Sequence, residues 1–328
     1  MCWEYDVLGI RLRSNVRISG VLAANLSSHD RQQIDVHLGA GRAPHTASLF
    51  PSEPWYLSQI LADNGQPLLT AWRSDRDDEY RLLYAEGTEF LLRQRGTQIW
   101  GNWQPAASLE LTALYLIGPV LAFALRLQGV TCLHASAVAV DGCAIAMVGG
   151  GGVGKSTTAA AFAVAGYGFL SEDISALSRR DGRYWVSPGY PEIRLWPESV
   201  KMLFGSEDAL PRILPTGEKR KLDLLAGPYR FQAEPLPLER IYVFRDWEAG
   251  RTAPSIRRVH PREGIVTLLA NTNLTYMLPN DTRASEFDVL TRLVSHVPVC
   301  WVTLSADGDD PLTLCATIVD DFRNRHAV

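Results

Sequence analysis

The most informative stretch of this chain is Gly149-Gly-Gly-Gly-Val-Gly-Lys-Ser156, which fits the pattern G-x4-G-K-[ST]. The apolar run Cys143–Val148 before it predicts a buried strand, and the alanine-rich run 156–165 after it predicts a helix. Glycines let successive backbone N–H groups point at a polyphosphate, and the helix directs its positive N-terminal end at the same anion. The sequence therefore predicts a phosphate-binding loop and a bound nucleoside triphosphate.

The loop motif also predicts roles for individual residues. Lys155 is expected to reach the outer phosphates, and Ser156 is expected to ligate Mg2+. The other reading, a glycine-rich surface turn, is disfavoured by the strand and helix that flank the loop. The residues expected to contact the nucleotide are Gly149, Gly150, Gly151, Gly152, Val153, Gly154, Lys155, Ser156 and Thr157.

Composition and charge limit the kinds of protein that this chain can be. The 328 residues are 46% hydrophobic and 21% charged, as in an ordinary soluble globular protein of one large or two unequal domains. A net charge of −4 gives no basic field for nucleic acid or an anionic membrane surface, so neither is expected as a partner. Lys219-Arg220-Lys221 is a local basic cluster, and Lys219 and Arg220 are candidate phosphate contacts. The longest apolar run, 111–125, is interrupted by Gly118-Pro119 and predicts a buried helix, since a membrane span needs about 20 residues.

The cysteines point to a reducing compartment. Five are scattered along the chain, none in a C-x-x-C pair, which indicates reduced structural thiols. The N-terminus shows no basic segment followed by an apolar one, as a secretory signal would have. These features predict a cytoplasmic protein.

The chain is expected to change character near residue 106. Residues 1–106 predict a β-rich domain of short strands, such as 18–26, 80–84 and 88–93, joined by turns. Its tryptophans, including Trp55, Trp72, Trp100 and Trp103, are expected either to build its core or to line a groove for a partner. This domain is predicted to recognise the substrate or to mediate oligomerisation.

Residues 107–328 are expected to form the nucleotide-binding domain, opening with a helix at 109–126. Strand-like segments at 174–178, 184–187, 192–196 and 240–244 surround the loop, and a helix–strand–helix series at 287–322 closes the chain. Meandering strands of this kind favour a mixed sheet over a doubly wound nucleotide fold.

Other positions have the chemistry of a site. His134 opens an apolar run, where a lone histidine is usually a satisfied buried residue. Glu172-Asp173 ends a predicted strand beyond the loop helix; such a pair is often a turn or cap, yet a Mg2+ ligand and a base would be placed there. Glu192 and Arg194 lie in a strand where both could be merely solvated. Taken singly, these residues decide nothing.

Together they resemble the C-terminal catalytic domain of the HPr serine kinase family. Its hallmark is a histidine on the strand before the loop, an acidic pair after the next strand, and then a Glu-Ile-Arg segment. Here His134 precedes Lys155 by 21 positions and Asp173 follows it by 18, which match the family's spacing. The resemblance covers about residues 130–196.

The resemblance implies a P-loop serine kinase related in fold to phosphoenolpyruvate carboxykinase, an α/β (α+β) fold with a mixed sheet. ATP or another nucleoside triphosphate would bind with Mg2+, and Lys155 would hold its outer phosphates. Asp173 would accept the proton of the attacking serine hydroxyl, and His134 would orient the phosphates and carboxylates. The implied metal-binding residues are Ser156, Glu192 and Glu172, the last of which supports the metal or the base.

Departures from the family shift the expected acceptor. Thr157 stands where HPr kinases have a glutamate, Glu172 stands where they have an aspartate, and no arginine-rich loop follows Glu192. The chain is therefore more similar to HPr-kinase-like proteins that phosphorylate a serine of a small protein or peptide, such as a lasso-peptide precursor, or free serine. Family members often form rings, which implies a homo-oligomer.

Rival functions remain open at this point. A GTPase or ATPase of the partitioning type uses an extra lysine where this loop has Gly150. A carboxykinase would need substrate-binding arginines that are not recognised here. A non-catalytic nucleotide sensor or adaptor is favoured by Glu172 in place of aspartate, and disfavoured by Asp173, Glu192 and Ser156, which a sensor does not need.

Overall fold

The computed structural model describes residues 2–24, 31–39, 50–74, 78–104, 107–245, 253–272, 277–305 and 310–324. The chain divides into two compact units, Met1–Val130 with Leu274–Thr282 and Thr131–Asn273 with Arg283–Val328. Both contain mixed sheets, so the protein is of mixed α/β class. The boundary expected near residue 106 lies at residues 105–106, outside the described residues, and the units divide later, after Val130.

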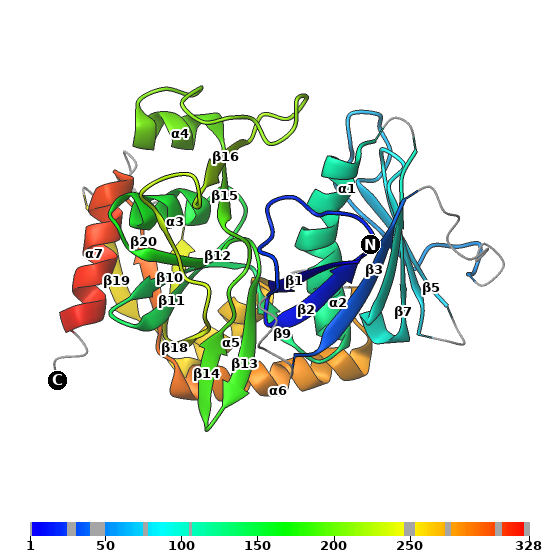
Figure 1. Ribbon diagram of the computed structural model, residues 1–328. Helices are drawn as coiled ribbons and strands as arrows, with labels where there is room; N and C mark the ends of the chain where they lie inside the picture. Colours follow the sequence, from blue (N-terminus) through cyan, green and yellow to red (C-terminus); the bar gives the residue numbers. More distant parts are fainter. Residues whose placement is uncertain are drawn as a thin grey trace. The chain divides into compact units, whose positions relative to one another are not determined.

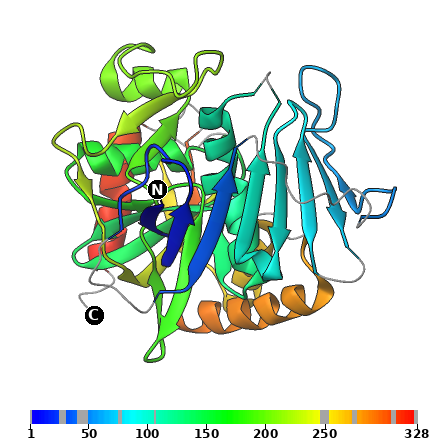
Figure 2. The same ribbon diagram turned by 45° about the vertical axis from the view of Figure 1, so that its right-hand side comes forward.

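The first unit is built on an eight-stranded sheet in the order β1-β2-β3-β8-β7-β6-β5-β4 (Figure 2). Strand β3 pairs in parallel with β2 and β8, and the other neighbours are antiparallel. No strand forms at residues 18–24, where one was expected, and residues 25–26 lie outside the described residues. The strands are β1 (Trp3–Val7), β2 (Ile10–Ser14), β3 (Gln33–Leu38), β4 (Tyr56–Leu57), β5 (Leu69–Arg73), β6 (Tyr80–Tyr84), β7 (Glu89–Arg93) and β8 (Gln98–Asn102), with the short helix η2 (Gln94–Gly96) before β8.

The predicted helix at 109–126 packs on this sheet, which is why the units divide after it. It comprises α1 (Leu109–Tyr115), a π-helical turn η3 (Leu116–Val120) and α2 (Leu121–Leu127), with the kink at Gly118-Pro119. Phe123 meets Tyr80 edge-on with ring centroids 5.1 Å apart. Among the described residues, Leu109–Leu127 alone is long and apolar enough to cross a membrane, but 67% of its most apolar stretch is buried, as in a core helix.

The tryptophans of the first unit do not form its core. Ala71 and Ile99 are buried, whereas the adjacent Trp72 and Trp100 are half-exposed, because neighbouring residues of a strand point to opposite faces. Trp72 lies under the Arg81 guanidinium at 4.6 Å from the ring centre. The core instead consists of aliphatic, Phe and Tyr side chains on the face toward α1 and α2.

The second unit carries the loop on a mixed ten-stranded sheet (Figure 1). The path runs β17-β12-β10-β11-β18-β14-β13-β9, and β20 pairs with both β18 and β19. Strand β11 is antiparallel to β10 but parallel to β18, so the sheet is mixed, as expected. The strands are β9 (Thr131–Leu133), β10 (Ala135–Val140), β11 (Cys143–Val148), β12 (Gly168–Ser171), β13 (Ser175–Arg180), β14 (Arg183–Val186), β17 (Arg230–Phe231), β18 (Leu236–Arg245), β19 (Ser255–Arg258) and β20 (Val299–Thr303). A separate hairpin pairs β15 (Glu192–Leu195) with β16 (Arg220–Asp223).

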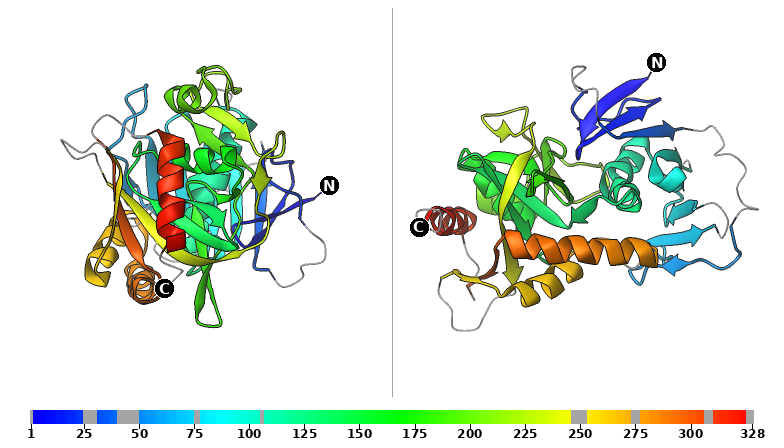
Figure 3. Two further views of the ribbon diagram at one scale, coloured as in Figure 1. Left: turned by 90° about the vertical axis from the view of Figure 1, so that its left-hand side faces the viewer. Right: turned by 90° about the horizontal axis from the view of Figure 1, so that it is seen from below.

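Helices cover both faces of this sheet, so its central strands are apolar on both sides. Ile145 and Met147 of β11 face the cluster that includes α3 (Lys155–Val164), α4 (Pro197–Phe204) and α7 (Pro311–Asn324). Ala144 and Ala146 face the cluster with α5 (Pro261–Ala270) and α6 (Asn280–His296). Figure 3 shows α7 on one side of the sheet and α5 with α6 on the other. The loop therefore begins at the carboxyl end of a strand that is buried on both faces.

Candidate active site

The loop leaves β11 and enters α3 as the sequence predicted. Gly152 and Gly154 have φ of 79° and 97°, a region that side chains with a Cβ rarely adopt. Within the described part of the chain, no amide of Gly150 to Gly154 donates to a backbone carbonyl or side chain. Free N–H groups at the start of a helix form an anion-binding concavity.

Gly149 is required by close packing. A Cβ there would lie 2.8 Å from Val153 Cγ1 and 3.0 Å from the Phe244 carbonyl oxygen, whereas one at Gly150 would meet nothing within 4 Å. We expect Gly149→Ala to lower the free energy of unfolding by about 1–3 kcal/mol, as overpacking does. Gly150→Ala, the matched control, should change it by much less. Urea unfolding of the two variants measures the difference, and equal stabilities would contradict this packing.

Lys155 is held at the loop by two carbonyl groups. Its Nζ donates to the oxygens of Gly149 and Gly150, both at 2.8 Å, and the residue is only 7% exposed. Burial lowers the pKa of Lys155, although the charges of Asp173 and Glu172 oppose this change. The ammonium group is therefore desolvated and close to the free amides of the loop.

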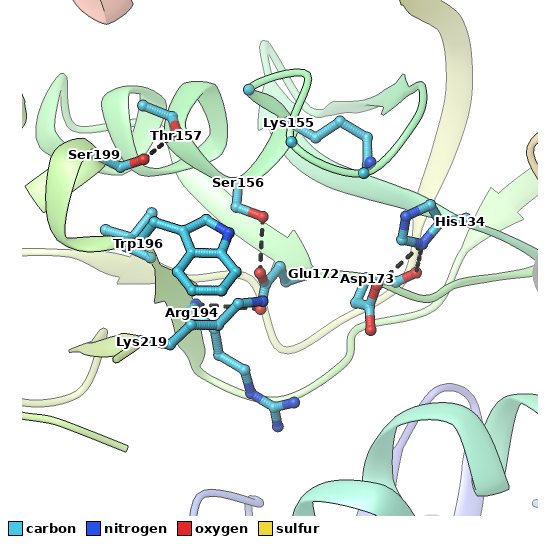
Figure 4. Close-up of a pocket in the computed structure, with 14 residues that line it drawn as sticks. His134, Lys155, Ser156, Thr157, Glu172, Asp173, Arg194, Trp196, Ser199 and Lys219 are labelled. Carbon is cyan, nitrogen blue, oxygen red and sulfur yellow. Dashed lines mark hydrogen bonds and ion pairs between the residues drawn. The ribbon is translucent and has the colours of Figure 1, made fainter. Parts of the chain in front are cut away.

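Ser156 and Glu172 meet across the cleft, as Figure 4 shows. The Ser156 hydroxyl donates to Glu172 Oε1 at 2.9 Å, and the amide of Arg194 donates to Oε2 at 3.2 Å. Glu172 follows the last residue of β12 and is 4% exposed. Burial raises its pKa to about 7, against the opposing charge of Arg194. A buried carboxylate beside a hydroxyl is a hard oxygen pair of the kind that Mg2+ takes.

Asp173 and His134 form a second pair in the same cleft. His134 Nδ1 lies 3.0 Å from Asp173 Oδ1 and 3.1 Å from the Asp173 carbonyl oxygen. Both partners accept, so Nδ1 carries a proton and donates it to them. Burial acts to raise the pKa of Asp173, but the hydrogen bond and charge of His134, with Arg194 and Lys219, lower it overall. Asp173 is thus ionised at neutral pH.

Asp173 is also set at an unusual backbone angle. Its φ is +64°, a left-handed conformation that aspartate and asparagine tolerate better than most residues. The turn brings the carboxylate to the cleft immediately after the buried strand ends, while Glu172 stays beneath Ser156. Two adjacent acids therefore take different places, one buried and one with a side chain 40% exposed.

The cleft has a volume of about 170 Å3 and gathers most of the predicted site. The predicted residues that line it are His134, Gly151, Gly152, Gly154, Lys155, Ser156, Thr157, Glu172, Asp173 and Lys219. Thr157 and Ser199 share a hydrogen bond between their hydroxyl groups at 2.8 Å. Gly149, Gly150 and Val153 do not line this cleft but line a second pocket on the loop.

Two residues that were predicted to bind the metal or a phosphate do not line the cleft. Glu192 does not line the cleft, because its carboxylate faces Arg194 at 3.6 Å and Lys221 at 3.8 Å. Two cations already balance that charge, so the arrangement does not support Glu192 as a metal ligand. Arg220 is buried and binds Asp208 at 2.7 Å, so it holds a loop rather than a phosphate.

Sequence reasoning missed other cleft residues. Arg194 is not solvated, since its side chain is 12% exposed and its guanidinium lies 4.8 Å from the Tyr190 ring centre. Trp196 lines the cleft with Lys219 Nζ 5.1 Å above its ring. Trp196-Pro197 begins helix α4, and this helix start is the signal that could have drawn attention to it.

Among the described residues, no group of three or more His, Cys, Asp or Glu side chains could hold a metal ion. Mg2+ in phosphoryl-transfer sites is bound by one or two carboxylates together with substrate phosphates. Ser156 and Glu172 fit that pattern.

The five cysteines are all free thiols, three of them buried.

The likeness of this chain to known proteins is weak. No family model matches the chain. No curated protein matches it either. Among solved structures, the chain is similar to the Hpr(Ser) kinase/phosphatase from Coxiella burnetii, with 13% sequence identity, a TM-score of 0.34, and coverage of 60% of this chain and 99% of that one. The score is too low to support a conclusion about activity.

Proposed function

We propose that this protein is an ATP- and Mg2+-dependent kinase that phosphorylates a serine hydroxyl of a peptide, a small protein or free serine. One observation carries the proposal. A single cleft holds the loop residues Lys155 and Ser156 together with two carboxylates of different character, Glu172 against Ser156 and Asp173 against His134. Phosphoryl transfer needs a phosphate cradle, a metal-binding acid and a base within reach of one another.

The donor triphosphate would lie along the free amides of the loop. Lys155 would exchange its bonds to the Gly149 and Gly150 carbonyls for bonds to the outer phosphates. Ser156 and Glu172 would hold Mg2+, which, when bound, neutralises charge on the phosphate oxygens. Burial disfavours the ionised form of Glu172. A cation bound between Glu172 and Ser156 would offset this free-energy cost.

The acceptor would enter on the side of Asp173. The serine oxygen forms a bond to the γ-phosphorus as the bond to the leaving ADP oxygen breaks. Asp173 takes the hydroxyl proton, and His134 holds its carboxylate through Nδ1–H. Lys219, which lines the cleft, is available to the transferring phosphoryl group. The side chains of Trp196 and Arg194 also line this cleft.

The other parts of the proposal concern setting. The first unit would recognise the acceptor or join copies of the chain in a homo-oligomer. Neither nucleic acid nor a membrane is proposed as a partner, in keeping with the net charge of −4. Free thiols in the second unit fit a cytoplasmic location.

The test is transfer itself. Incubation with γ-32P-ATP, Mg2+ and serine-containing peptides, with free serine in a parallel reaction, should label an acceptor at serine. Omitting Mg2+ by chelation should abolish the label, and threonine or tyrosine replacing the acceptor serine should reduce it. If ATP binds at the loop and no acceptor is labelled across such a panel, the protein is a nucleotide sensor and the kinase proposal is wrong.

A further inference from the structure

A second pocket lies on the opposite side of the loop from the acidic pair. Strand β12, which leads to Glu172 and Asp173, is reached from β11 through β10, whereas β18 and β20 lie on the other side of β11. The pocket is lined by loop residues 149–153 and by the carboxyl ends of β18 and β20. Gly151 and Gly152 line both this pocket and the cleft. A ligand lying along the loop can therefore extend from one into the other.

The two spaces differ in size. The cleft measures about 170 Å3 and already holds the reacting groups, whereas the second pocket measures about 870 Å3. Sites for small organic ligands and cofactors usually measure about 300–1,000 Å3. The cleft is large enough for a phosphoryl group and an acceptor hydroxyl. Of these two spaces, the second has the volume of a site for a base and a sugar.

The lining of the second pocket suits a nucleobase. Trp301 of β20 is half-buried, and the guanidinium groups of Arg245 and Arg257 lie 4.3 Å and 4.7 Å from its ring centre. Aromatic rings and guanidinium planes are the surfaces on which proteins stack bases. Thr267, Asn271 and Thr303 add polar groups to the same wall.

We infer that this pocket binds the base and ribose of the nucleoside triphosphate, with the base against the Arg245–Trp301 stack. The triphosphate then follows the loop amides past Gly151 and Gly152 to Lys155, and its terminal phosphoryl group enters the cleft. The inference rests on the proposed function only in taking the ligand of the loop to be a nucleotide. It assigns recognition of the base to Trp301 and Arg245 in the second pocket, and not to Trp196 in the cleft.

The experiment compares a whole nucleotide with its phosphates alone. Calorimetry with Mg2+ gives the Kd of ATP and of inorganic tripolyphosphate for the natural protein and for Trp301→Ala, Arg245→Ala and Trp196→Ala. Loss of base stacking should weaken ATP binding about 10-fold in Trp301→Ala. Tripolyphosphate affinity should stay within about twofold, because the loop is untouched. Trp196→Ala tests the cleft as the rival base site. Trp72→Ala, measured alongside, is the matched control and should bind ATP normally, because Trp72 also stacks with an arginine but belongs to the first unit.

Arg245 is exposed, so Arg245→Ala tests the pocket even if Trp301→Ala does not fold. A selective loss of ATP affinity in Trp196→Ala, or unchanged ATP affinity in both Arg245→Ala and Trp301→Ala, overturns the inference while the kinase proposal stands. A selective loss in Trp301→Ala or Arg245→Ala without any transfer to serine supports the nucleoside pocket and counts against the kinase. Failure of the natural protein to bind either ligand overturns both.

Discussion

Asp173→Asn is expected to lower the rate of phosphoryl transfer by about 10²- to 10⁴-fold while leaving ATP affinity nearly unchanged. General-base help is worth a factor of that size. The asparagine side chain keeps an oxygen that can accept from His134 Nδ1–H, and asparagine also tolerates the left-handed backbone found at this position. The substitution therefore removes the charge and the proton acceptor with little change in shape.

Single-turnover transfer from labelled ATP measures this effect separately from nucleotide binding. The matched control is Asp181→Asn, since Asp181 also has a positive φ, of 50°, but is exposed in a hairpin turn. It should transfer at the natural rate. Because the pKa of Asp173 is lowered, the rate should be independent of this group at neutral pH and be lost only as the pH falls through its low pKa. A natural rate in Asp173→Asn would remove the proposed base.

Glu172→Gln is expected to stabilise the nucleotide-free protein and at the same time to weaken Mg2+-dependent ATP binding. The pKa of Glu172 rises from 4.5 to about 7 on folding, so the folded state keeps a proton that the unfolded state has released. The contribution of Glu172 to stability is therefore greatest below about pH 4.5 and falls as the pH rises to about 7. The charge on Glu172 costs roughly 3 kcal/mol of folding free energy above that window.

Glutamine removes that cost because it stays neutral and its carbonyl oxygen can still accept from Ser156. Urea unfolding at pH 8 should show the variant more stable by about that amount, and the fall between pH 4.5 and 7 should diminish. In calorimetry, ATP affinity with Mg2+ should drop by at least roughly 10-fold, as changes around a metal site do.

Glu192→Gln is the control variant that tests which of the two carboxylates binds Mg2+. Its carboxylate faces Arg194 and Lys221 rather than Ser156, so ATP affinity with Mg2+ should be preserved in that variant. If Glu192→Gln instead loses Mg2+-dependent binding and Glu172→Gln does not, the metal belongs to Glu192, as the family resemblance implied. Equal stability of Glu172→Gln and the natural protein at pH 8 would contradict the buried charge.

Much of the second unit was predictable because its signals are local. The loop glycines are dictated by backbone geometry within a few residues, and the flanking apolar and alanine-rich runs follow the periods of strand and helix. The helices at α6 and α7 and the strands β18 and β20 were likewise recognised from their own patterns. Burial of the 111–125 helix was predictable because its apolar run is too short and too interrupted to span a membrane.

The errors were in questions that no local pattern answers. The half-exposed Trp72 and Trp100 follow from which face of their strands meets α1 and α2, and the pattern of one strand does not say which face is covered. Arg220 and Lys219 are neighbours of like charge, yet one binds Asp208 and the other lines the cleft. Lys219 lies just before β16 and Arg220 is its first residue, so only the pairing of β15 with β16 decides where each side chain goes.

The glycine-rich loop, the strand and helix around it, and the acids and histidine from which the candidate site is drawn can all be recognised in the sequence. The tertiary structure alone decided that Glu172 rather than Glu192 meets Ser156, that Asp173 pairs with His134, and that Trp301 and Arg245 flank a second pocket on the loop. The physical reason is distance along the chain. A loop of eight residues is specified by its own backbone, but these contacts join strands and helices far apart in sequence, and packing of the sheet brings them together.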